Sequence, residues 1–179
     1  MARNLTILLL IASLSSCISV EFTQPQPNWC ANLTEFPIEM RGHFYSNEND
    51  TIEIGNTYYK LVSENKNSIL DIDAKNTEQL SDSLLFKSYK KKYFLNSKTN
   101  GNWRVSLIKI NKNHSITVYN AISSEEKLIK KLKIVKDKTI IKDETGKIKR
   151  VLFNPSEKEF KKLVRRNLFV EYMVLKKVK

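Results

Sequence analysis

Short runs of alternating apolar and polar residues fill the chain from residue 37 to residue 122. A period of two is typical of half-buried β-strands, and pairs of Gly, Asn or Lys separate the runs in the manner of turns. The connections are short, so neighbouring strands are expected to pair in the antiparallel sense. The pattern predicts strands over residues 42–45, 51–54, 57–62, 68–72, 84–89, 92–96, 103–110 and 115–122, with a short helical turn at 37–41 and a loop or irregular helix at 74–83.

The connections between these strands carry residues that favour tight turns. Gly55-Asn56 lies between two β-rich runs, and Lys90-Lys91 and Asn100-Gly101 occupy equivalent places further along. Gly and Asn adopt positive φ angles at low cost, and two-residue hairpin turns require such angles. We therefore expect positive φ at Gly55-Asn56 and a meander from residue 84 to residue 122.

Beyond residue 122 the spacing of the apolar residues changes to that of helices. Ser123 and Glu126 form a capping-box pattern ahead of apolar residues at 128, 129 and 132, and Ser156 and Glu159 form a second one ahead of apolar residues at 160, 163 and 164. In such a box the serine and the glutamate satisfy N–H groups that the first turn of a helix leaves free. Asn167 suits the left-handed position that ends a helix. Two short helices are therefore predicted.

A hairpin over residues 139–142 and 147–153 separates these helices, and β-branched and aromatic residues predict a final strand over 168–178. The elements together predict an α+β fold: a mostly antiparallel sheet of about eight to ten strands, a meander able to curl towards a barrel, and two short helices in the C-terminal half. Residues 37–179 are expected to form this single globular domain.

The N-terminal segment has a different composition. Arg3 precedes an apolar run from Leu5 to Leu14, and the sequence Leu14-Ser15-Ser16-Cys17 closes the run. The run is shorter than the roughly 20 residues needed to cross a bilayer, but it has the length of a signal-peptide core. The sequence from Leu14 to Cys17 resembles the lipobox of bacterial lipoproteins.

This resemblance implies that residues 1–16 are a signal peptide and that Cys17 is acylated and begins the mature protein. Lipoproteins of this class carry a diacylglycerol and an amide-linked chain on that cysteine. Ile18 follows, in place of the aspartate that retains some lipoproteins at the inner membrane, so the resemblance favours the outer membrane of a bacterial cell envelope. Residues 17–36, which include Gln24-Pro25-Gln26-Pro27, are expected to form a polar tether between the lipid and the domain.

Two alternatives to lipidation remain open. In the first, an ordinary secretory signal is cut after Ser19, and Cys17 is lost from a secreted, non-lipidated protein. In the second, Cys17 is retained without lipid and forms a disulfide with Cys30. If Cys17 carries lipid, Cys30 is the one cysteine left of two, and we expect it to be an inert thiol.

Charge is distributed unevenly along the chain. Residues 17–89 contain 5 cations and 11 acids, whereas residues 90–179 contain 25 cations and 8 acids. Three lysines stand between aromatic residues from Tyr89 to Phe94, and cations cover the polar faces of both predicted helices. A solvated lysine-rich surface is the simplest interpretation, and the alternative is a basic C-terminal half that binds an anionic lipid or polysaccharide. No nucleic acid is expected as a partner of an exported protein.

No pattern of catalytic or metal-ligating residues is visible in the sequence. His43 falls at a predicted strand start and His114 in a turn, and neither has a partner at metal-ligand spacing. We therefore predict no catalytic residue, metal or cofactor, and one modified residue, Cys17. The leading hypothesis is a non-enzymatic, lipid-anchored envelope protein that binds or scaffolds at the outer membrane. The alternative is a lipocalin-like β-barrel that binds a small apolar ligand, because the Gly42-x-Phe-Tyr45 segment and the later meander are faintly similar to such barrels.

Overall fold

The computed structural model describes residues 18–47, 50–62, 77–122 and 124–178. Cys17, Ser123 and the strand predicted over residues 68–72 lie outside these ranges. Two α-helices, α2 (Glu125–Leu132) and α3 (Glu157–Arg165), and a 3-10 turn, η2 (Ile38–Met40), lie among the described strands. The strands are β1 (Ser19–Phe22), β2 (Asn32–Leu33), β3 (Gly42–Tyr45), β4 (Thr51–Ile54), β5 (Tyr58–Val62), β6 (Thr77–Gln79), β7 (Leu84–Tyr89), β8 (Lys92–Thr99), β9 (Asn102–Ile110), β10 (Ile116–Ala121), β11 (Lys138–Lys142), β12 (Ile148–Phe153) and β13 (Phe169–Lys177).

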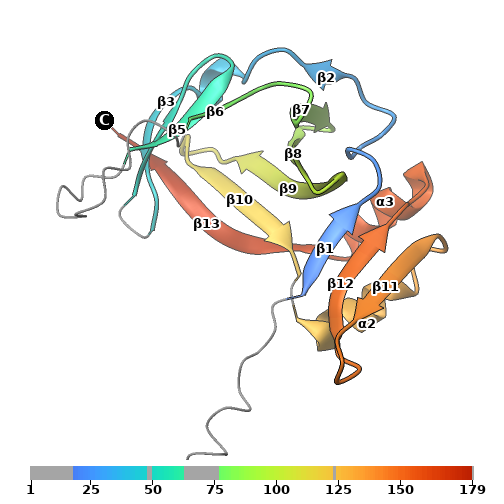
Figure 1. Cartoon of the computed structure of the whole chain (residues 1–179). Coiled ribbons are helices and arrows are strands. Elements are labelled where there is room, and N and C mark those ends of the chain that lie inside the picture. Colours follow the sequence, from blue (N-terminus) through green and yellow to red (C-terminus); the bar gives the residue numbers. More distant parts are fainter. Residues whose placement is uncertain (1–17, 48–49, 63–76, 123, 179) are drawn as a thin grey trace, which may run out of the picture.

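These strands form one strongly curved sheet, a half-barrel (Figure 1). Ten strands follow one another in the order β11-β12-β1-β9-β10-β13-β3-β4-β5-β6, while β8, β7 and β2 branch from β9. The described ladders are antiparallel apart from that of β1 with β12, which is parallel. The predicted α+β class, with a mostly antiparallel sheet and two helices in the C-terminal half, is therefore confirmed.

The segment that follows Cys17 is part of the sheet, and the predicted tether over residues 17–36 is wrong for its described part. β1 lies between β12 and β9, with Phe22 opposite Phe153 of β12. Phe22 is completely buried, and Ile18 is 5% exposed. Apolar residues at positions 18, 20 and 22 form a short strand pattern of period two, which the prolines a few residues later obscure in the sequence.

The residues after β1 are held against the sheet by Asn96 of β8. The Asn96 side chain accepts a hydrogen bond from the backbone N–H of Gln26 at 2.5 Å and donates one to the Gln26 carbonyl at 2.8 Å. Asn96 and Gln26 are both fully buried. Because the amide supplies both partners in the absence of bulk water, a polar and proline-rich segment can be packed inside the fold.

The β4–β5 hairpin forms where it was predicted, but its glycine has a different role. Ile54 lies opposite Tyr59, and the Gly55 N–H donates to the Tyr58 carbonyl at 2.9 Å. Neither Gly55 nor Asn56 has a positive φ, so that prediction is wrong. A Cβ atom on Gly55 would lie 2.3 Å from the Tyr58 ring, so a larger residue at position 55 would have to displace this ring.

The β7–β8 hairpin turns on two consecutive lysines in the left-handed region. Lys90 has a φ of 49° and Lys91 a φ of 58°. A residue with a Cβ atom pays roughly 1–2 kcal/mol for this conformation, and such strain is typical of functional sites. The predicted Asn100-Gly101 turn has the expected positive φ angles of 51° and 81°.

The predicted helix caps agree with the structure more closely at α3 than at α2. At α3 the predicted capping box is confirmed, since Ser156 accepts a hydrogen bond from the Glu159 N–H and Glu159 accepts one from the Ser156 N–H. Asn167, with a φ of 55°, follows the helix in the left-handed conformation, as predicted. At α2 the N-cap is Ser124 and its side chain makes no capping hydrogen bond.

The predicted loop or irregular helix over residues 74–83 is wrong for residues 77–79, which form β6. This strand pairs with β5 and all three of its side chains are exposed. It buries no apolar residue, so the alternation that marks the other strands is missing from its sequence.

Two apolar clusters stabilise the half-barrel. One contains residues of α2, α3, β1 and β12, and the other contains residues of η2, β3 and β4 together with residues of β9, β10 and β13. Among the described residues, no helix combines the length and the apolar character needed to cross a membrane. The largest fully buried side chains of the first cluster are Phe22, Phe94, Phe153, Phe160, Leu128, Leu163 and Leu168, and those of the second are Met40, Phe44, Phe86 and Ile116.

Candidate functional site

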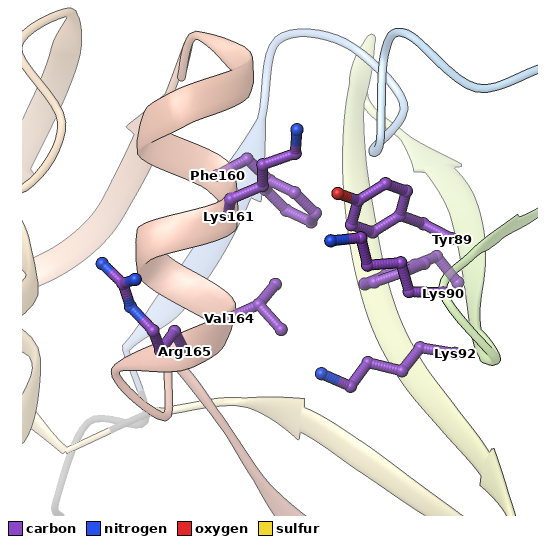
Figure 2. Close-up of a pocket in the computed structure, with 8 residues that line it drawn as sticks. Tyr89, Lys90, Lys92, Phe160, Lys161, Val164 and Arg165 are labelled. Atoms are coloured by element: carbon purple, nitrogen blue, oxygen red, sulfur yellow. The ribbon is translucent and has the colours of Figure 1, made fainter.

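A pocket of about 350 Å³ lies between α3 and the β7–β8 hairpin. Figure 2 shows side chains from the helix and from the hairpin facing one another across it. We call it the α3 pocket. Half of its lining residues are cations and the other half are apolar or aromatic: Tyr89, Lys90, Lys92, Phe94, Phe160, Lys161, Val164 and Arg165.

The floor of the α3 pocket is apolar. Phe160 and Val164 are four residues apart on α3 and therefore point in the same direction, towards the hairpin (Figure 2). Phe94 of β8 packs against Phe160, with ring centroids 5.6 Å apart. Both phenylalanine side chains belong to the buried core, so the floor is held rigidly by the same contacts that stabilise the fold.

The rim of the α3 pocket is cationic. Lys90 lies in the strained turn and Lys92 is the first residue of β8, and the ammonium groups of both extend towards α3 (Figure 2). Arg165 lies on the last turn of α3, and in the same view its guanidinium group points away from the cavity. The two hairpin lysines therefore supply the charge that faces the pocket, and the Arg165 stem closes one side.

Among the cations that line the pocket, Lys161 makes an ion pair and two cation–π contacts. It pairs with Glu157 one turn earlier on α3, and its Nζ lies 5.3 Å from the Trp29 ring centroid and 5.2 Å from that of Tyr89. Hydrogen bonds with the Glu157 carboxylate and the Tyr89 hydroxyl raise the pKa of Lys161 above its ordinary value. Lys161 is therefore a permanent ammonium group at neutral pH, and Glu157 neutralises part of its charge.

Trp29 forms an aromatic wall behind Lys161. Its ring makes edge-on contacts with Tyr89 and with Phe160, at centroid distances of 5.6 Å and 5.9 Å. Such pairs each contribute about 0.5–1.5 kcal/mol beyond the area they bury. The segment predicted as a tether thus packs against two of the residues that line the pocket.

The charges on the rim have no acidic partner within the described residues. No carboxylate forms an ion pair with Lys90, Lys92 or Arg165 there. Lysine offers three donors on a mobile stem and binds phosphate as a point charge. An anion that entered the pocket would meet unneutralised ammonium groups. The ion pairs of the described residues are Arg41–Glu35, Arg150–Glu21 and Lys161–Glu157.

The other residues singled out in the sequence lie elsewhere. Cys30 is a free thiol, and burial raises its pKa by more than the neighbouring Lys87 lowers it, so the thiol stays protonated at neutral pH. The Lys87 ammonium donates to the Cys30 carbonyl at 2.7 Å, and desolvation lowers the pKa of this buried lysine. His43 and His114 are exposed. In the described ranges no three His, Cys, Asp or Glu side chains lie close enough together to hold a metal ion.

The sequence contains both halves of the α3 pocket but not their association. Three lysines flanked by aromatic residues mark residues 89–94, and a basic polar face marks α3, yet Phe94 and Phe160 are far apart in the sequence. Only the packing of α3 on β8 brings the halves together. The arrangement suits a ligand with an anionic group for the rim and an apolar part for the floor.

No known protein family, curated protein or solved structure matches the chain.

Proposed function

We propose that this protein is a lipid-anchored component of a bacterial cell envelope, held at the outer membrane through Cys17, and that it binds an anionic amphiphile in the α3 pocket without catalysing a reaction. The observation that carries the binding proposal is the pairing of an apolar floor with lysines that have no acidic partner among the described residues. Phosphate, sulfate and carboxylate groups all satisfy the rim chemistry.

The apolar floor favours an amphiphile over an acidic polysaccharide. A sugar ring carries hydroxyl groups on most of its edges, and Phe94, Phe160 and Val164 offer them no hydrogen-bond partner through their side chains. An alkyl or aryl group instead gains about 0.025 kcal/mol for each Å² of apolar surface removed from water. The volume of about 350 Å³ lies within the usual range of small-molecule pockets.

A binding role also agrees with the protonation of the pocket. The raised pKa of Lys161 keeps this amine protonated, and a protonated amine is neither a nucleophile nor a general base. Glu157 is engaged by Lys161, so this carboxylate is held on the helix side of the pocket.

The position of β1 supports lipidation at Cys17 over cleavage after Ser19. Cleavage after Ser19 would remove Ile18, which is 5% exposed within the apolar cluster beneath the helices. It would also shorten a strand that begins at residue 19. Removal of residues 1–16 leaves all of β1 intact, and two or more acyl chains on Cys17 would hold the protein stably on a membrane.

The pocket is tested by titrating the purified protein with dodecyl phosphate below its micelle concentration, with Trp29 fluorescence as the signal. Lys92→Glu is expected to weaken binding about tenfold or more, because a charged hydrogen bond contributes about 1.5–3 kcal/mol. Lys142→Glu, which makes the same charge change on the exposed end of β11, is the matched control and should leave the affinity within about twofold. Equal affinities of the wild type and Lys92→Glu would refute the proposed ligand site.

Lipidation is tested by feeding expressing cells an alkyne analogue of palmitate. The wild type should incorporate the label, Cys17→Ser should lose it, and Cys30→Ser should retain it. Label that persists in Cys17→Ser, or a mature protein whose mass corresponds to cleavage after Ser19, would overturn the anchor.

A further inference from the structure

The sheet divides along one edge of β9. On that edge β10 pairs with residues 107–110 and β1 meets Trp103, while β8 pairs along the opposite edge. Between them, the described ladders leave residues 104–106 of β9 without a strand partner on this side. Separating strands expose the sheet face between them, and a groove opens at this fork.

The groove consists of two adjoining cavities, of about 610 Å³ at the fork and about 240 Å³ further in. They share lining residues, among them Leu95, Ser106 and Asn120, so they adjoin each other, and we call the two together the fork groove. Ser106 donates a hydrogen bond to the Asn120 side chain at 2.8 Å and bridges β9 and β10 where the cavities meet.

The fork groove changes from polar to apolar along its length. Arg104 and Glu171 lie at the outer cavity, together with several serines. The inner cavity is lined mainly by aliphatic side chains, including Ile108, Val118 and Leu175. A polar mouth and an apolar interior suit a long hydrocarbon chain that enters from the fork.

The mouth of the fork groove lies beside the site of the proposed lipid anchor. Ile18, Ser19 and Val20 line the outer cavity, and Ile18 is the residue directly after Cys17. Because Ile18 is packed in the core and β1 begins at the next residue, no tether separates Cys17 from the groove. Any acyl chain on Cys17 therefore starts within a residue of the groove wall.

We infer that one of the acyl chains carried by Cys17 lies in the fork groove. This inference rests on the proposed acylation of Cys17. The four-residue step along β9 from Arg104 to Ile108 spans about 14 Å at about 3.4 Å per residue. One leaflet of the hydrocarbon core, which a single acyl chain crosses, is about 15 Å thick. The length of the groove along β9 thus corresponds to the length of one acyl chain.

Covalent attachment makes the anchor chain a stronger competitor than a free lipid. Its local concentration at the mouth is in the millimolar range that short linkers give, before any contact is made. A lipoprotein of this class has three chains, so two remain in the bilayer, which is enough for stable anchoring.

The test uses the full chain, expressed in cells fed a palmitate analogue that carries a diazirine near its end and a terminal alkyne. Isolated membranes are irradiated, and the peptide that contains Cys17 is mapped by mass spectrometry. We expect cross-links from this lipidated peptide to the peptides that contain Ile108, Val118 and Met173 of the same chain. Label on Cys17 with cross-links to membrane lipids only would overturn the inference and leave the anchor intact. Absence of label would overturn the anchor and the inference together.

A variant whose fork groove is filled by a large side chain provides the second arm of the test. Ser106→Trp places an indole where the two cavities meet and should lower the intramolecular cross-links at least tenfold, with unchanged label on Cys17. Thr139→Trp adds the same side chain at an exposed position on β11 and should leave the cross-links unchanged. Retained cross-links in a folded Ser106→Trp protein would refute groove occupancy. If Ser106→Trp does not fold, the wild-type cross-link map alone decides the question.

Discussion

Phe22→Ala is the sharpest test of the packing of the N-terminal segment. Phe22 has no exposed surface, and its ring lies 6.0 Å from that of Phe153 and 5.9 Å from that of Phe160. Truncating a buried phenylalanine to alanine costs about 3–5 kcal/mol through lost burial and the cavity left behind. A chain of this size typically has a free energy of unfolding of about 5–15 kcal/mol, so the loss is a large share of the total.

The assay is urea unfolding, followed by far-ultraviolet circular dichroism and by tryptophan fluorescence. With a slope of about 2 kcal/mol/M, the midpoint should fall by about 2 M. Phe22→Leu retains most of the volume and should cost about 1–1.5 kcal/mol. Thr23→Ser, at the exposed next position, keeps the hydroxyl that donates to the Asn154 side chain and should change the stability by less than about 0.5 kcal/mol. A Phe22→Ala protein within 1 kcal/mol of the wild type would mean that residues 18–22 are not packed in the sheet.

Three further substitutions address other parts of the fold. Asn96→Ala leaves the N–H and C=O of Gln26 buried without partners. It should lower the free energy of unfolding by about 2–4 kcal/mol in the same urea assay. A loss under 1 kcal/mol would contradict the packing of the Gln26 segment against β8. Lys91→Gly removes left-handed strain and should raise the thermal midpoint, with a gain of about 0.5–1 kcal/mol, whereas a lowered midpoint would refute the argument. Partial burial raises the pKa of Glu159, but hydrogen bonds from the N–H groups of Ser156 and Lys136 outweigh this effect and lower the pKa overall. The stabilisation that the ionised Glu159 side chain provides is therefore complete above its unfolded-state pKa of about 4.3. It is lost as the pH falls through the lower pKa that Glu159 has in the folded protein. Glu159→Gln should destabilise the protein at pH 7 and approach the wild type at pH 3; a gap of equal size at both pH values would contradict this assignment.

Local signals in the sequence predict the elements whose formation depends on nearby residues. The Ser156–Glu159 box and the left-handed Asn167 bound α3 as expected, because a cap is satisfied within one turn of helix. The Asn100-Gly101 turn likewise has the predicted geometry, since two residues contain all its requirements.

The elements that the sequence misses depend on distant partners. β1 becomes a central strand only because β12 and β9 flank it, and β6 exists only because β5 offers an edge to pair with. Gly55 illustrates the same point at a single residue, since the Tyr58 ring occupies the space that a Cβ atom would need, whereas the φ of Gly55 is not positive. The α3 pocket is hidden for the same reason, because its two walls meet only after α3 packs on β8.

The parallel pairing of β1 with β12 also determines how the chain can acquire its structure. Ser19 lies opposite Arg150, a separation of 131 residues, and such non-local pairings form slowly because a long loop must close first. During synthesis, β1 is made early, but it cannot pair with β12 until the C-terminal part of the chain has been made. Both partners of β1, β9 and β12, lie in the C-terminal half of the chain, so both ends are expected to unfold in one cooperative transition. A truncation that removes β12 should therefore also destroy order at the opposite end of the polypeptide.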